Sequence, residues 1–358
     1  FLPNEGEPMK QNKNISIKQI AKLSGVSVAT VSRVINNNGR FSEETRERVM
    51  KIIDEYNYTT NMAAKSLRIS KSKTIGVIVP DVNNGFFSEL VLEIEKYFFS
   101  HGYSVFICNT NQDEAKEKSY FRSLDSKLVD GIICISAISI DPAKCIKRNI
   151  PVVFINNKDY KDFYCVESDH YKGGFYATEE LINNGCKHIV LLTNNRNSSS
   201  VDNKIKGFKS AMEKHNIPIY KDLTLRLDLK NGSFEDAMQA INNLIDNNIE
   251  FDGIFATNEW RAHGALVALQ QHNISVPDKV KIVGYDGTYV SKYCNPPITT
   301  IYQDKKELAF KSSELLLNLI NEETVDSKKD IIIPIKLKID TIIERKFLTV
   351  TKYTIHDA

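Results

Sequence analysis

The sequence predicts an all-α helix-turn-helix head followed by an α/β core of two doubly wound, parallel-sheet lobes. Apolar side chains recur at helical spacing over residues 15–60, whereas the chain from residue 73 alternates short apolar runs with amphipathic segments. Charge is divided in the same way, since residues 9–73 carry 13 Lys and Arg against five Asp and Glu, and residues 74–358 carry a net charge of −4. A basic head on an acidic body indicates that the head alone meets a polyanion.

Three short helices are expected in the head. Ser16 and Gln19 fit a capping box, and Gly25 suits the left-handed backbone of a sharp turn after the first helix. Ser27 is expected to cap a second helix at 28–35, and a third amphipathic helix follows.

From residue 73 the apolar runs predict strands and the intervals predict helices. Strands are expected at 75–80, 103–109, 130–136, 151–156, 188–193, 223–229, 252–257 and 280–286. Helices are expected at 87–100, 171–184, 205–215, 234–247 and 261–272. Such alternation is typical of parallel sheets covered by helices on both faces. Two further apolar stretches, 298–303 and 331–339, flank a helix at 305–320 and are expected to carry the chain back between the lobes.

These patterns divide the chain into segments. Residues 1–14 are expected to be disordered or a remnant of cloning, with a natural start at Met9. The predicted parts are a helix-turn-helix domain at 15–60, a connecting segment at 61–72, a first lobe of 73–168 plus 300–330, a second lobe of 169–299 plus 331–347, and a tail at 348–358.

Composition argues against several classes of protein. No apolar run approaches the roughly 18 residues of a membrane span, and no secretory signal precedes the head, so we expect a cytoplasmic protein. The six cysteines lack metal-ligand spacing and are expected to be reduced and packed. We find no paired nucleophile and base, no phosphate-cradling glycine loop and no metal cluster, and His101, His188 and His263 are expected to pack or lie on the surface. We therefore expect no enzyme, no cofactor and no metal.

The second head helix is predicted to read DNA. Its outer side combines small and polar residues, which allow close approach to the major groove: Val28, Ala29, Thr30, Ser32, Arg33 and, just after it, Asn36. Arg33 can donate two hydrogen bonds to guanine, whereas Thr30, Ser32 and Asn36 suit phosphates. A helical bundle that binds protein is the alternative, but the basic charge and the lack of bulky exposed hydrophobes disfavour it.

The segments SIKQIAKLSGVSVATVSRVINNN, SEETRERVMKIIDEYNY and NMAAKSLR resemble the head of the lactose-repressor and galactose-repressor family of bacterial transcription regulators. PDVNNGFFSEL, ESDHYKGG, ATNEWRAHGAL, VPDKVKIVGYDG and PITTIYQD continue the resemblance, which runs from Ser16 to about Phe347. It implies a core like that of periplasmic binding proteins. Gln19 departs from the usual Asp, which affects only a helix start.

The resemblance also implies roles in DNA binding. Base readers would be Val28, Ala29 and Arg33, and Ser16 and Ile17 begin the first helix at the DNA. Residues 61–67 would form a hinge helix that folds in the minor groove, with Asn61 and Ala64 at the DNA and Leu67 as an apolar wedge. The residues themselves fit this idea, because small alanines allow helix pairing and one exposed leucine can unstack bases.

An effector pocket is expected between the lobes, at the carboxyl ends of the strands. The residues that follow strands or the lobe crossover are Asn84, Phe86, Phe87, Ser136, Asp169, Asn258, Glu259, Trp260, Asp286 and Gln303. The resemblance implies the same places and adds Ser200, Lys204 and Phe234. Lys204 stands where many members have Arg, Glu259 where Asp is common and Gly85 where Pro is common, so the effector's identity is not carried over.

Together these features predict a DNA-binding transcriptional repressor of a carbohydrate operon. We expect a homodimer or tetramer that binds a near-palindromic operator and dimerises through the first lobe. Amides, carboxylates and aromatic walls favour a small uncharged sugar such as sucrose, and Lys204 as main cation leaves a phosphosugar open. Alternatives are a purine-responsive repressor, a global catabolite regulator co-repressed by a phosphorylated carrier protein, and a sugar-binding transport protein.

Overall fold

The chain forms two compact units in the computed structural model, Phe1–Ser72 and Lys73–Ala358. The described residues are 15–58, 71–135, 141–159, 162–196, 198–228, 232–325 and 329–339. The predicted hinge-helix residues Asn61, Ala64 and Leu67 lie outside them, as do the predicted pocket residue Ser136 and the terminal segments 1–14 and 348–358.

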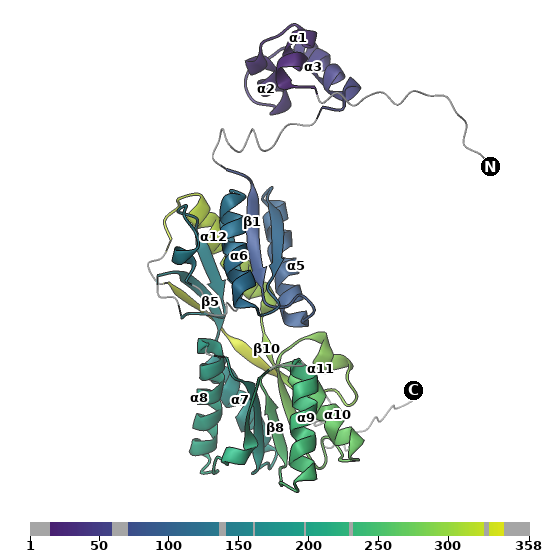
Figure 1. Ribbon diagram of the computed structural model, residues 1–358, viewed down its shortest axis with the longest axis vertical. Helices are drawn as coiled ribbons and strands as arrows, with labels where there is room; N and C mark the ends of the chain where they lie inside the picture. The colour runs from purple at the N-terminus through teal and green to yellow at the C-terminus, as the bar shows by residue number, and fades with distance from the viewer. Residues whose placement is uncertain are drawn as a thin grey trace, which may run out of the picture. The chain divides into compact units, whose positions relative to one another are not determined.

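The head consists of three short helices around a small apolar core (Figure 1). The helices are α1 (Ile17–Ser24), α2 (Val28–Ile35) and α3 (Glu43–Glu55). Their apolar residues recur at helical spacing, so one side of each helix faces inward. The buried core residues are Ile20, Ala21, Val31, Val34 and Val49.

Hydroxyl and glycine residues set the helix ends of the head. The Ser16 side chain accepts a hydrogen bond from the Gln19 backbone, and Gln19 Oε1 accepts one from Ser16 N at 2.8 Å, which confirms the predicted capping box. Gly25 ends α1 at φ 67°, a conformation that side chains disfavour. Ser27 Oγ then accepts from Thr30 N at 3.1 Å and starts α2. These local bonds fix the turn between the two helices.

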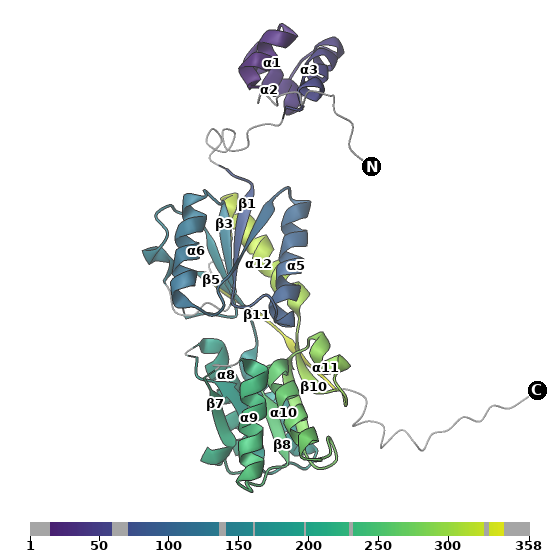
Figure 2. The same ribbon diagram turned by 45° about the vertical axis from the view of Figure 1, so that its right-hand side comes forward.

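The first lobe is a six-stranded parallel sheet between helices (Figures 1 and 2). Its elements are β1 (Thr74–Val79), α5 (Gly85–Ser100), β2 (Ser104–Asn109), α6 (Glu114–Ser126), β3 (Gly131–Ile135), the 3₁₀ turn η1 (Pro142–Lys144), β4 (Val152–Ile155), β5 (Tyr164–Ser168), α12 (Lys305–Ile320) and β11 (Asp330–Ile333). The strand order is β11-β5-β4-β3-β1-β2, and each neighbouring pair is parallel. Helices α5 and α12 pack on one face and α6 on the other.

The second lobe repeats this plan. Its elements are α7 (His170–Asn183), β6 (Ile189–Asn194), α8 (Ser199–Lys214), η2 (Lys221–Leu223), β7 (Thr224–Leu227), α9 (Ser233–Asp246), β8 (Gly253–Ala256), α10 (Glu259–Gln271), β9 (Lys281–Asp286), α11 (Tyr289–Tyr293), β10 (Thr299–Gln303) and β12 (Ile335–Lys338). The strand order is β12-β10-β9-β8-β6-β7, with β12 antiparallel to β10. Helices α9 and α10 cover one face, α7 and α8 the other. In the described part of the chain, no helix is long and apolar enough to cross a membrane.

The chain passes between the lobes three times, after β5, β10 and β11. Here the predicted lobe boundaries need correction. β10 was placed in the first lobe but pairs with β9 of the second, and β11 was placed in the second lobe but pairs with β5 of the first. The stretch 331–339 forms two strands in two sheets because Pro334, which lacks an N–H donor, separates them.

Glycines allow α7 and α8 to approach closely. A Cβ at Gly174 would collide with the carbonyl oxygen of Lys204, and one at Gly207 would collide with that of Tyr171. Only hydrogen side chains fit at such a crossing. The contact fixes α8 against α7 and thereby fixes the position of Lys204.

All six cysteines are free thiols, and five of them are buried. Burial raises the pKa of Cys108 to about 11 and that of Cys186 to about 12, so both are protonated near neutral pH. Among the described residues, no group of His, Cys, Asp and Glu is arranged to hold a metal ion.

Candidate functional site

The outer side of α2 carries the residues predicted to read DNA. Val28, Ala29, Arg33 and Asn36 are exposed. Thr30 and Ser32 are half-buried. Thr30 Oγ1 forms a hydrogen bond with Ser27 Oγ at 2.9 Å, and the Ser32 carbonyl accepts one from Asn36 Nδ2 at 2.7 Å. Ser16 caps α1, whereas Ile17 packs partly against the head core. Fewer residues are therefore exposed on and just after α2 than were predicted to reach DNA.

Arg33 is held by its stem and open at its end. Gly39, at φ 90°, lies against it, so that a Cβ there would sit 3.3 Å from Arg33 Cδ. No ion pair among the described residues of the head includes Arg33. A planar guanidinium on an anchored stem can present two parallel donors to one acceptor edge.

The core contains a cavity of about 920 Å³ lined by both lobes. Its lining comes from segments that follow strands, as expected for doubly wound sheets. The structure brings ten of the predicted pocket residues together there: Asn84, Phe86, Phe87, Ser200, Lys204, Phe234, Asn258, Trp260, Asp286 and Gln303. Ser136 falls outside the described residues.

Two predicted pocket residues lie elsewhere. Asp169 caps α7, accepting from Lys172 N at 3.0 Å and pairing with Lys172 Nζ at 2.9 Å. Glu259 is buried behind the cavity lining, where its carboxylate accepts from Gly287 N at 2.7 Å and Thr288 N at 2.9 Å. Asp169 therefore starts a helix, and Glu259 holds the turn that follows Asp286.

A chain of hydrogen bonds forms the buried floor of the cavity. Gln303 Nε2 donates to Asp286 Oδ1 at 2.7 Å, and Asn156 Nδ2 donates to Gln303 Oε1 at 3.1 Å. His170 bonds Asn156 Oδ1 through Nε2 and Tyr285 OH through Nδ1, each at 3.0 Å. Burial holds the pKa of His170 well below its usual range, so the ring is neutral, with one nitrogen donating and the other accepting. These hydrogen bonds connect Asn156 of the first lobe with four residues of the second lobe, which are His170, Tyr285, Asp286 and Gln303.

Asp286 and Lys204 are oppositely charged side chains at this floor, and the charge of each affects the pKa of the other. Burial raises the pKa of Asp286 to about 7, and it lowers that of Lys204 to about 8. Lys204 Nζ donates to the Thr257 carbonyl at 3.1 Å and lies 3.8 Å from the centre of the Tyr285 ring. Asp286 also adopts φ 111°, a strained conformation of the kind found at functional sites.

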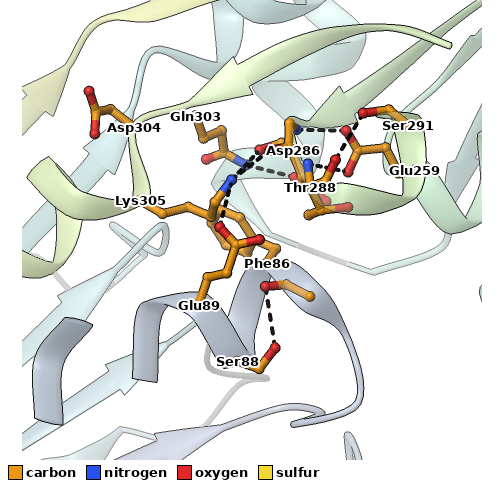
Figure 3. A network of polar contacts seen from close by, with 12 residues as sticks. Phe86, Ser88, Glu89, Glu259, Asp286, Thr288, Ser291, Gln303, Asp304 and Lys305 are labelled. Carbon is orange, nitrogen blue, oxygen red and sulfur yellow. Dashed lines mark hydrogen bonds and ion pairs between the residues drawn. The ribbon is translucent and has the colours of Figure 1, made fainter. Parts of the chain in front are cut away.

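Lys305 links the lobes beside Asp286 (Figure 3). Its Nζ, at the start of α12, donates to the Gly287 carbonyl at 2.7 Å and to the Asp286 carbonyl at 3.3 Å, and it pairs with Glu89 of α5 at 3.3 Å. One ammonium thus connects two helices of the first lobe to the strained turn of the second. It holds Asp286 toward the cavity.

The cavity has two aromatic walls. Phe86 and Phe87 on α5 meet edge to face with ring centres 5.4 Å apart. Phe234 lies 6.4 Å from Trp260 and 5.2 Å from His263. His263 was expected to pack or lie on the surface, but it lines the cavity with Trp260 because both project from the first turns of α10. Aromatic faces suit the apolar side of a sugar ring or a planar base.

Sequence reasoning missed two cations. Lys204 was expected to be the main positive charge, but Arg196 and Arg261 line the same cavity. Arg196 lies two residues after the end of β6, so the strand-end rule could have found it. Arg261 lies within α10, where the apolar pattern of the helix indicates burial and gives no sign that a charge faces a ligand.

The raised pKa of Asp286 predicts a pH-dependent cost to folding. Because the folded state binds this proton more tightly than the unfolded state, stability contributed by Asp286 falls as pH rises from about 4 to about 7. Between pH 5 and pH 8 we expect Asp286→Asn to gain about 2 kcal/mol relative to the natural chain. Urea unfolding of both chains at each pH measures this difference, and a constant difference across the range would contradict the assignment.

Family models match both units. Residues 72–341 match periplasmic binding proteins and the sugar binding domain of the LacI family, and residues 16–61 match bacterial regulatory proteins of the lacI family. The chain is 35% identical over 299 residues to the HTH-type transcriptional regulator DegA of Bacillus subtilis (strain 168), covering 82% of this chain and 88% of DegA. It is 33% identical over 314 residues to the HTH-type transcriptional repressor PurR of Vibrio campbellii (strain ATCC BAA-1116), covering 86% of this chain and 92% of PurR.

Solved structures give the same likeness. The Lac repressor dimer bound to operator and the anti-inducer ONPF matches with TM-score 0.81 and 26% identity, over 91% of this chain and 98% of that one. A periplasmic binding protein/LacI transcriptional regulator from Alkaliphilus metalliredigens QYMF, complexed with D-xylulofuranose, matches with TM-score 0.66 and 32% identity, over 75% and 97%.

A helix-turn-helix head joined to a two-lobed core with a cavity at its strand ends defines a ligand-responsive, DNA-binding regulator. The chain belongs to the lacI family of bacterial regulatory proteins, as a DNA-binding transcriptional repressor with an effector-binding core.

Proposed function

We propose that this repressor controls a carbohydrate-utilisation operon and that a small sugar binds in the cavity between the lobes. The proposal places a homodimer on a near-palindromic operator, with one head in each half-site. Sugar binding changes the arrangement of the lobes and releases the DNA. Coupling of about 1–3 kcal/mol corresponds to roughly a 5- to 150-fold change in operator affinity.

The polar floor and aromatic walls of this cavity carry the proposal. Asp286 and Gln303 can accept and donate hydrogen bonds to ring hydroxyls, while Phe86, Phe87 and Trp260 offer flat apolar faces. A hydroxylated ring needs this combination of polar edge and apolar face. The Alkaliphilus regulator was solved with D-xylulofuranose, which supports a sugar of pentose or hexose size. Sucrose is a larger candidate within the same class.

A purine-responsive repressor is the second candidate. The edge-to-face pair of Phe86 and Phe87 also fits a planar base, and Asn84, Asn258 and Gln303 could bond its edge. The two candidates differ in the shape of the ring, since a base needs only a narrow slot. A cavity of about 920 Å³ favours the thicker sugar ring.

The test is a release assay on the full chain. An operator selected from random palindromic DNA is labelled, and its binding is followed by fluorescence anisotropy as pentoses, hexoses, disaccharides and nucleobases are added. We expect a sugar to weaken operator binding 5- to 150-fold. If only hypoxanthine or guanine alters binding, the purine candidate replaces the sugar.

An uncovered apolar surface supports dimerisation through the first lobe. β2 is the edge strand of its sheet, and its neighbouring residues Phe106 and Ile107 are 46% and 52% exposed although they point to opposite faces. Leu92 and Phe99 of α5, which packs against β2, are exposed as well. Monomeric proteins rarely leave such edges open, so a second copy of this chain is the proposed cover.

Charges on this edge strand are expected to separate the dimer. Phe106→Lys with Ile107→Lys places two ammoniums in the proposed interface, where each would be desolvated without a partner. We expect a monomer by sedimentation and a loss of operator affinity of at least about 100-fold, since the two heads no longer bind together. Tyr293→Lys, at a more exposed aromatic in the second lobe, is the control and should stay dimeric. An unchanged dimer in the double variant would contradict this surface.

A further inference from the structure

Arg261 is a buried cation in an unfavourable place. It lies in the first turn of α10, where aligned peptide dipoles already present partial positive charge, and it is only 2% exposed. Its Nη1 donates to Thr257 Oγ1 at 3.3 Å, but its Nε has no hydrogen-bond partner. A buried donor without an acceptor costs free energy until a ligand supplies one. Arg261 lines the cavity, so a bound ligand can reach it.

Arg196 is a second cation at the same cavity. No ion pair in the described part of the chain includes either arginine. Burial, and then the charge of Arg196, lower the pKa of Arg261 to about 10, which leaves it charged at neutral pH. The two guanidiniums repel one another across the cavity, while the negative charges of Asp286 and Asp236 act on Arg261 in the opposite direction.

Helix ends add to this positive charge. Five helices, α5, α7, α8, α9 and α10, begin at the cavity and contribute residues of their first turns to its lining. Their N-terminal N–H groups favour anions. Among the acids of the lining, Asp228 and Glu235 are exposed and Asp81 is half-buried. The buried acid of the lining, Asp286, is already bonded to Gln303.

We propose that the effector carries an oxyanion, a carboxylate or a phosphate, and that Arg261 and Arg196 bind this group. The inference rests on the proposed function, because it specifies the sugar that this cavity takes. An oxyanion would accept a hydrogen bond from the unpaired Nε of Arg261 and balance the charge of both arginines. The sugar hydroxyls of the same ligand would lie toward Asp286 and the aromatic walls. A hydroxyl of a neutral sugar can accept the hydrogen bond of Nε, but it does not balance the charge of the two arginines.

The test compares matched ligands on the full chain by titration calorimetry. The probes are galactose with galacturonate, glucose with gluconate and glucose 6-phosphate, and xylulose with xylulose 5-phosphate. We expect at least one anionic member to bind about 100-fold more tightly than its neutral counterpart, as charge-assisted hydrogen bonds predict. Binding by sugar acids alone assigns a carboxylate, and binding by sugar phosphates alone assigns a phosphate.

Substitutions separate this inference from the function on which it rests. Arg261→Met and Arg196→Gln should each reduce the ratio of anionic to neutral sugar affinity at least tenfold, whereas Arg226→Gln, exposed and outside the cavity lining, should leave this ratio unchanged. Arg261→Met should also raise the unliganded Tm by about 2–4 °C, since it removes a buried charge. Such a rise would show that Arg261→Met folds. If Arg261→Met does not fold, Arg196→Gln alone tests the anionic preference.

Three results would decide against the inference. If neutral and anionic sugars bind equally, or if Arg261→Met keeps the preference, the oxyanion site is wrong and the sugar-responsive function stands. If neither kind of sugar binds while hypoxanthine or guanine does, the proposed function falls together with the inference.

Discussion

Replacing Arg33 with Ala is expected to lower operator affinity by about 30- to 10 000-fold. A dimer presents one Arg33 to each half-site, and each bidentate contact with guanine is worth about 1–3 kcal/mol. The side chain lies on the exposed side of α2 with its stem against Gly39, so its removal leaves the head core intact. Anisotropy titrations with the selected operator and with unrelated DNA measure the loss.

Comparing the loss of affinity for the operator with the loss for unrelated DNA shows whether Arg33 reads bases. Arg46→Ala removes the same charge from the head, but Arg46 lies on α3 and pairs with Glu43 at 3.3 Å. We expect this control to weaken operator and unrelated DNA alike, by a factor of about 3 at ordinary salt. Arg33→Ala should instead lose affinity chiefly for the operator. If the two variants behave alike, Arg33 acts as a phosphate contact and α2 is not the base-reading helix.

Replacing Asp286 with Asn is expected to leave a repressor that no longer responds to its effector. A hydrogen bond to a charged group contributes about 1.5–3 kcal/mol, so ligand affinity should fall about 10- to 150-fold. Asn preserves the shape of the side chain and tolerates positive φ better than most residues, which keeps the strained turn at 286 in place. Calorimetry measures the affinity, and the release assay shows whether DNA stays bound at saturating effector for the natural chain.

A matched control lies nearby in sequence. Asp304 caps α12 and lies outside the cavity lining, and Asn caps a helix as well as Asp does. Asp304→Asn should therefore respond normally. Gln303→Ala, which removes the partner of Asp286, should weaken the effector in the same direction as Asp286→Asn. A normal response in both Asp286→Asn and Gln303→Ala would show that the effector binds elsewhere.

Local signals made most of the fold predictable. Hydroxyl caps and helical spacing set the head, and uninterrupted apolar runs marked the buried strands. Strand β5 was not predicted, because its sequence YCVES has only a short apolar stretch before Glu167 and Ser168. The exchange of β10 and β11 between the lobes depends on pairing between distant strands, which periodicity along the chain does not encode.

The cavity was predictable where residues follow strands, and less so elsewhere. Asn84, Asp286 and Gln303 obey that rule, since each stands at the end of a strand or just after it. Glu259 obeys it too, yet its side chain turns away to bond the backbone of Gly287 and Thr288. Arg261 lies in the first turn of α10, where only the three-dimensional structure shows which way the guanidinium faces.

The three passages of the chain between the lobes bear on how the protein is made by the ribosome. The apolar face of the first sheet is covered by Leu308, Leu315 and Leu316 of α12, and its last strand is β11. Both emerge only after every element of the second lobe except β12 has been synthesised. Strands β1 to β5 must therefore wait, partly uncovered, while more than 130 residues are added, as the distance from Ser168 to Lys305 implies. The lobe whose sequence comes first is thus completed only when nearly the whole chain has been made.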